Sequence, residues 1–94
     1  MLHIVKEKLI IAKPLLEKKY HVRLFGLFGS VVRGDFTNDS DIDILVDFNK
    51  PIGIEFVDLA NDLETLLKRK VDLVSLKGLN PGYFQFIENE IVYV

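Results

Sequence analysis

The 94-residue sequence contains no cysteine. This absence excludes disulfide frameworks, thiolate catalysis and cysteine-based zinc sites, and it fits a reducing compartment. A surplus of basic residues is also absent, because the formal net charge is −2. Domains that bind nucleic acid usually carry a basic patch or stripe, so DNA and RNA are weak candidate partners.

Long apolar runs are missing as well. No stretch approaches the roughly 20 apolar residues that a membrane-spanning helix needs. The start of the chain, MLHIVKEKLI, carries charges through its apolar run and has no small-residue cleavage site, which favours a helix over a signal peptide. We therefore expect a cytoplasmic protein, folded as a single domain over residues 1–94.

Hydrophobic spacing predicts three helices. The first is expected from His3 to Lys19, where apolar residues recur at helical spacing, at Ile4, Leu9, Ala12 and Leu16. Pro14 removes one backbone hydrogen bond, so we expect a kink or a restart there, with Pro14 in a first turn. The second helix is expected over residues 51–70, capped by the basic run 68–70, and the third over residues 83–90 after the turn-rich residues 77–82.

β-branched and aromatic residues predict strands over residues 22–28, 42–48 and 71–76. Alternation places four apolar side chains of the middle strand on one face and four others on the opposite face, namely Asp41, Asp43, Leu45 and Asp47. We expect Asp47 to be a solvent-facing charge. The alternating elements favour a two-layer α+β domain, in which a small mixed sheet has its helices packed on one face and an open site on the other.

The C-terminal aromatic residues Tyr83, Phe84 and Phe86 are expected in the core together with the apolar tail 91–94, since so small a domain needs most of its apolar residues inside. Exposure of these aromatic side chains would instead mark a partner surface. His3 and His21 are expected at the surface.

The motif Gly29-Ser30 follows the first predicted strand. Glycine allows a tight turn after a strand, and the amides that follow would point at an anion such as a phosphate if they open a short helix. The Ser30 hydroxyl can add a further donor. A Gly-Ser pair alone is common, so its meaning depends on the residues that accompany it.

Asp41 and Asp43 accompany it, at the start of the second predicted strand. Residues two apart on a strand project from one face with Cα atoms about 6.5–7 Å apart. Such carboxylates suit magnesium, which is usually held by one or two carboxylates together with substrate phosphates. Asp72, at the start of the third predicted strand, is the best candidate for a third carboxylate if its strand lies beside the second; otherwise it faces water.

These residues together resemble the nucleotidyltransferase superfamily related to the palm of DNA polymerase beta, and most closely its minimal nucleotidyltransferases, some of which are antitoxins of HEPN-domain toxins. The family pattern reads roughly G-S-x-x-x-G followed by S-D-x-D. This chain matches it at Gly29, Ser30, Gly34, Ser40, Asp41 and Asp43.

The resemblance implies a magnesium-dependent protein adenylyltransferase that moves AMP from ATP to a tyrosine of a partner HEPN toxin. It implies that the nucleotide lies against Gly29, Ser30, Arg33 and Ser40. It implies further that the catalytic ligands of two magnesium ions are Asp41, Asp43 and Asp72. Larger relatives carry an added helical domain for the acceptor, which this sequence lacks, so the partner is expected to supply the acceptor.

Other interpretations remain open from the sequence. Arg33 can equally pair with Asp35 or Asp39, which are themselves expected to form turns. The domain can act as a non-catalytic antitoxin that neutralises its partner by contact, although a domain without chemistry has no reason to hold carboxylates together. It can also transfer the nucleotide to a small molecule or an RNA end.

Overall fold

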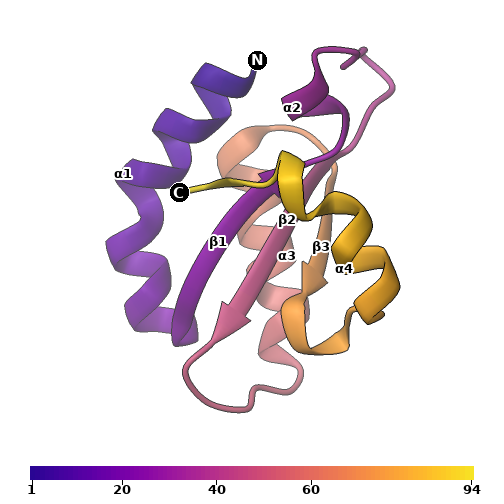
Figure 1. Ribbon diagram of the computed structural model, residues 1–94. Helices are drawn as coiled ribbons and strands as arrows, with labels where there is room; N and C mark the ends of the chain where they lie inside the picture. The colour runs from indigo at the N-terminus through magenta and orange to yellow at the C-terminus, as the bar shows by residue number, and fades with distance from the viewer.

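Four strands form one mixed sheet (Figure 1). The computed structural model describes residues 1–94. The strands are β1 (Val22–Phe28), β2 (Ile42–Phe48), β3 (Val71–Ser75) and β4 (Val92–Tyr93), in the order β3-β2-β1-β4. β1 is antiparallel to both of its neighbours, whereas β2 and β3 are parallel. The predicted mixed sheet is confirmed, and the tail adds an edge strand that the sequence did not indicate.

Two helices, α1 (Leu2–Tyr20) and α3 (Glu55–Leu67), pack on one face of the sheet and enclose the main core. Their buried side chains are Val5, Leu9, Leu16 and Tyr20 from α1, and Leu59, Leu63 and Leu67 from α3. The two helices are also joined by polar contacts, because the Tyr20 hydroxyl and the Lys19 ammonium both donate to Asp62. The predicted two-layer α+β fold is confirmed.

Helix α1 differs from the sequence prediction in two respects. It runs through Pro14 without a restart, so Pro14 lies inside the helix and not in a first turn. Packing of both halves of α1 against one core compensates for the missing backbone hydrogen bond. The buried face also includes Val5 in place of Ile4, which is half exposed.

A short helix, α4 (Pro81–Ile87), lies on the opposite face of the sheet and covers part of it (Figure 1). Its Ile87 side chain is buried against Phe28 of β1 and Leu45 of β2. Asn80 caps the helix, since its side-chain oxygen accepts hydrogen bonds from the amides of Gly82 and Tyr83. This second face is therefore partly covered, and α4 is an exception to the prediction that the helices pack on one face.

The prediction of a wholly buried C-terminal aromatic group was wrong for two of its three members. Phe84 packs beside Ile87, but Tyr83 and Phe86 are exposed and stack on each other with ring centroids 6.5 Å apart. A helix of only seven residues turns one narrow face to the sheet, so its remaining apolar side chains stay in solvent.

Three short elements complete the chain. They are α2 (Ser30–Arg33) and two 3₁₀ turns, η1 (Leu76–Gly78) and η2 (Glu88–Glu90). None of the helices is long and apolar enough to cross a membrane.

Candidate functional site

Gly29 forms the turn between β1 and α2, and it touches Asp43 on the neighbouring strand. Its φ of +76° lies where residues with side chains are strained. A Cβ atom added to Gly29 would lie 2.0 Å from Oδ2 of Asp43. Glycine is therefore required at position 29, and the Gly29-Ser30 turn lies directly against a carboxylate of the predicted site.

Asp43 and Asp72 are neighbours across β2 and β3. The two strands are parallel, and Asp43 is the register partner of Asp72. The expected adjacency of the third carboxylate is therefore confirmed, although the Asp72 side chain also reaches solvent. Asp41 directly precedes β2 and is exposed. All three carboxylates thus lie at the same end of the sheet as Gly29.

The carboxyl group of Asp43 has a perturbed pKa. Burial raises this pKa from 3.8 to about 6, together with the negative charge of Asp72, a hydrogen bond shared with Asp72 and the charge of Asp41. Arg33 opposes the rise with its positive charge. Three carboxylates therefore lie close together, and Arg33 offsets their negative charge only in part. A cation would be stabilised among them.

The carboxylates of Asp41, Asp43 and Asp72 fit magnesium, because they offer only oxygen atoms as ligands. No group of three His, Cys, Asp or Glu side chains is already arranged to hold a metal ion. A magnesium ion takes only one or two protein carboxylates and completes its shell with water and substrate phosphates. Asp43 with a neighbouring carboxylate meets that requirement without a complete protein cage.

The remaining predicted site residues lie on and after α2. Ser30 opens α2, and Arg33 ends it with a half-exposed side chain. Arg33 lies 3.6 Å from Asp35 and does not pair with Asp39. The Ser40 hydroxyl accepts a hydrogen bond from the amide of Thr37, so it stabilises the loop before Asp41.

One residue at this site was missed by the sequence analysis. The Glu90 carboxylate accepts a hydrogen bond from the Gly29 amide at 2.6 Å and lies 3.4 Å from Arg33. Only the pairing of β4 with β1 brings position 90 to this end of the sheet, and a two-residue strand in an apolar tail gives no periodic signal of its own.

Asp47 was predicted to face solvent, and this prediction was wrong. It is only 4% exposed, and its Oδ2 atom accepts hydrogen bonds from Arg23, 2.8 Å from Nε. Alternation assigned the face of β2 correctly but could not indicate that Arg23, placed at an irregularity in the β1–β2 register, covers this carboxylate.

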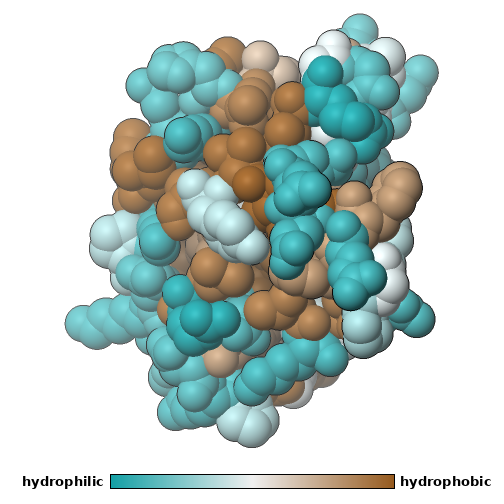
Figure 2. All heavy atoms as spheres, viewed as in Figure 1, coloured by the Kyte–Doolittle hydropathy of each residue, from teal (hydrophilic) through white to brown (hydrophobic).

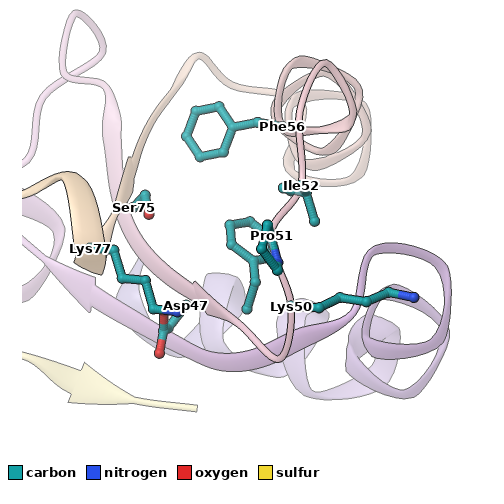
Figure 3. Close-up of a pocket in the computed structure, with 8 residues that line it drawn as sticks. Asp47, Lys50, Pro51, Ile52, Phe56, Ser75 and Lys77 are labelled. Carbon is teal, nitrogen blue, oxygen red and sulfur yellow. The ribbon is translucent and has the colours of Figure 1, made fainter.

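Asp47 also borders a cavity of about 330 Å³ at the opposite end of β2 from Asp43 (Figure 3). The cavity lies under the loop that joins β2 to α3, and the Lys77 side chain extends toward Asp47. Its lining is Asp47, Phe48, Lys50, Pro51, Ile52, Phe56, Ser75 and Lys77. None of the predicted site residues lines it, so we place the chemistry at the carboxylate end of the sheet.

Known proteins are similar to this chain in sequence and in fold. A family model described as polymerase beta, nucleotidyltransferase matches residues 11–93. The protein adenylyltransferase MntA of Thermococcus cleftensis is 45% identical over 83 residues, which cover 87% of this chain and 84% of the relative.

Solved structures of toxin–antitoxin complexes are similar as well. A toxin–antitoxin complex with AMP-PNP aligns with a TM-score of 0.76 at 30% identity, covering 93% of this chain and 69% of that one. A structure of a tri-AMPylated Shewanella oneidensis HEPN toxin with its MNT antitoxin aligns with a TM-score of 0.68 at 28% identity, covering 99% and 71% of the two chains.

Proposed function

This chain belongs to the polymerase beta nucleotidyltransferase family, and from that premise we propose that it is an antitoxin that transfers AMP from ATP to a tyrosine of a HEPN-type toxin. The similarity to a protein adenylyltransferase supports the reaction. The similarity to an antitoxin in complex with an AMPylated HEPN toxin supports the partner. The cytoplasm, where ATP is available, is the compartment that this function requires.

The contact between Gly29 and Asp43 is the observation that carries the proposal. A turn suited to phosphate and a carboxylate suited to a metal ion lie within van der Waals distance of each other. Nucleotidyl transfer needs such proximity. The donors that hold the phosphates and the cations that neutralise developing charge must act on the same phosphate group.

The nucleotide would lie against the Gly29-Ser30 turn. The amides of Ser30 and Val31 open α2 and have no partner within the helix, so they can donate to phosphate oxygens. Arg33, one turn later, can add a charged donor. The Ser40 hydroxyl would support this arrangement from the loop that leads into β2.

Asp41, Asp43 and Asp72 are the groups that would hold two magnesium ions, which neutralise developing charge on the attacking and leaving oxygens when bound. In the transfer, the tyrosine oxygen forms a bond to the α-phosphorus, and the bond from that phosphorus to the bridging oxygen breaks. Pyrophosphate departs and the tyrosine proton is released. The exposed side of Asp72 leaves room for the incoming tyrosine.

The partner would supply the acceptor hydroxyl, and we therefore propose that the functional unit is a hetero-oligomer with the toxin. The cavity beside Asp47 lies at the other end of the sheet from the carboxylates, and none of the four cavities in the structure is lined by Asp41, Asp43 or Asp72. Exposed carboxylates at Asp41 and Asp72 suit an acceptor presented by another protein.

Loss of transfer in carboxylate variants tests this proposal. The protein is incubated with ATP, magnesium and a HEPN-type protein from the same genome, and adenylylated tyrosine is detected by mass spectrometry. We expect Asp41→Asn and Asp43→Asn to abolish the product, whereas Asp39→Asn, in the exposed loop before them, retains it. Persistent adenylylation by the Asp41→Asn/Asp43→Asn double variant would refute the two-metal arrangement.

Neutralisation by contact alone is the rival function. The exposed side chains of Tyr83 and Phe86 favour it in part, because stacked aromatic residues in solvent suit a protein interface. The Asp43→Asn variant separates the two functions. Full neutralisation of the toxin by that variant without ATP would favour contact alone, and failure to neutralise would favour catalysis.

A further inference from the structure

Glu90 binds the Gly29 amide and Arg33 at the turn where the proposed function places the nucleotide. Its carboxylate lies 2.6 Å from the Gly29 amide nitrogen, and the same oxygen lies 3.4 Å from Nη1 of Arg33. The side chain is about three-quarters buried, at 24% exposed, so solvent screens these contacts only partly. A negatively charged group therefore already lies between the turn and the arginine.

We infer that Glu90 is an internal anion that competes with the nucleotide's phosphates for Gly29 and Arg33. This inference rests on the proposed function, which places a triphosphate at the same turn. An amide N–H donates one strong hydrogen bond, so the Gly29 amide cannot serve the carboxylate and a phosphate oxygen fully at once. A carboxylate left beside a triphosphate would also repel it.

The main chain around Glu90 is held on both sides, so its side chain is the part that can move. Before it, Ile87 is buried against the sheet. After it, the amide of Val94 bonds to the carbonyl of Phe25, and the Lys13 ammonium donates to the carbonyl of Val94 at 2.7 Å. Rotation of the carboxylate toward solvent releases the turn without breaking these contacts.

Competition of this kind makes nucleotide affinity depend on the charge of residue 90. Without nucleotide, the carboxylate satisfies the Gly29 amide and keeps Arg33 near the turn. With nucleotide, Arg33 exchanges one anion for another. Glu90 is thus a specificity-determining residue that favours an anion able to make several contacts at once, such as a magnesium triphosphate, over a simple anion.

Binding of AMP-PNP with magnesium, measured by calorimetry, tests the inference. Glu90→Gln keeps a side-chain oxygen that can accept from Gly29 but removes the charge. We expect it to bind AMP-PNP about two- to fivefold more tightly than the unmodified protein, as partly screened ion pairs suggest. Glu88→Gln, two residues away and exposed, is the matched control and should leave affinity unchanged.

The possible outcomes separate this inference from the proposed function. Equal or weaker binding by Glu90→Gln overturns the inference, because a residue that only supports the turn would produce that result. Tighter binding without adenylyl transfer to the toxin supports the inference while refuting the proposed function. Absence of AMP-PNP binding in both the unmodified protein and the variant refutes both.

A second measurement tests whether Glu90 and the nucleotide compete for the Gly29 amide. In ¹⁵N NMR spectra, the Gly29 amide resonance should shift on Glu90→Gln substitution and again on AMP-PNP addition. The Gly29 resonance of the Glu88→Gln variant should match that of the unmodified protein. A Gly29 resonance that does not respond to nucleotide would show that the phosphates bind elsewhere, and it would overturn the competition.

Discussion

At the scale of single residues, Asp43 and Gly29 depend on each other. The glycine leaves space for the carboxylate, and the carboxylate lies so close that an alanine at position 29 would collide with it. Burial and the neighbouring charges of Asp72 and Asp41 raise the pKa of Asp43 to about 6. The folded, metal-free protein therefore holds this carboxylate at a cost in stability.

Asp43→Asn is expected to stabilise the metal-free protein. Because the folded-state pKa is raised, the folded state binds more protons than the unfolded state, and the charge of Asp43 destabilises the fold above pH 6. The free energy of unfolding at pH 8 in EDTA should rise by about 1 kcal/mol, a value that is reduced because the carboxyl group is partly exposed to solvent. Urea unfolding measures it.

The pH dependence provides the internal control. The gain from Asp43→Asn should shrink as pH falls through 6 and vanish near pH 4, where Asp43 is protonated in the folded protein. Asp39→Asn, in an exposed loop, should leave stability unchanged. A loss of stability in Asp43→Asn at pH 8 would contradict the assignment of an uncompensated charge.

Arg23 and Asp47 form a second dependent pair of residues. The Oδ1 atom of Asp47 is buried without a hydrogen-bond partner, and Arg23 is the one residue that forms an ion pair with this carboxylate. Arg23→Gln should destabilise the protein by about 1–3 kcal/mol, less than for a fully buried pair because Arg23 is half exposed. Urea unfolding of Arg23→Gln and of Lys18→Gln, an exposed control, measures the loss of stability in each variant. Equal losses in the two variants would contradict this function of Arg23.

The residue types at the site could be predicted from the sequence, but their partners could not. The sequence places Asp41, Asp43 and Asp72 at the starts of their predicted strands, which fixes the end of the strand that each one occupies. Glu90 stands in a segment whose place depends on β4 pairing with β1, which no local pattern indicates. Long-range contacts of this kind are decided by packing.

At the scale of elements, α4 limits how much of the second sheet face is open. It packs Ile87 over β1 and β2, and η2 then leads the chain to Glu90 at the site. The sequence predicted a short helix over residues 83–90, after a turn that included Pro81, whereas α4 starts at Pro81 and ends at Ile87. The face that it covers was not predicted. Seven residues contain too few apolar positions to specify a buried face.

Asn80→Ala should weaken α4. The Asn80 side chain accepts hydrogen bonds from two amides of the first turn, and loss of such a cap costs about 1 kcal/mol. Because α4 positions Glu90, hydrogen exchange of amides in residues 81–90 should also accelerate. Asn89→Ala, in exposed η2, is the control, and identical exchange in the two variants would contradict this function of the cap.

At the scale of the whole molecule, apolar side chains remain in solvent after folding. Figure 2 shows apolar surface that extends from the α1 side across the middle of the molecule. On α1 the exposed apolar side chains are Ile4, Ile10, Ile11 and Leu15, with exposed fractions between 52% and 80%. Helical periodicity predicted one buried face of α1, but this helix has apolar residues on other sides too, and sequence alone could not assign them.

The architecture as a whole brings the Gly29-Ser30 turn and the carboxylates of Asp41, Asp43 and Asp72 to one end of the sheet. The nucleotidyltransferase family model matches residues 11–93 of this chain. In this account the partner completes the reaction by presenting its tyrosine to the open edge near Asp72. The α-phosphate, with its nucleoside, is therefore the group that we expect to move to the partner.

ATP labelled at a single phosphorus position distinguishes transfer of AMP from transfer of the γ-phosphate. With magnesium and a HEPN-type protein from the same genome, label at the α-phosphorus should appear on the partner, and label at the γ-phosphorus should appear in free pyrophosphate. Transfer of γ-label to the partner would show phosphoryl transfer, and no labelling of the partner by either ATP would contradict catalysis.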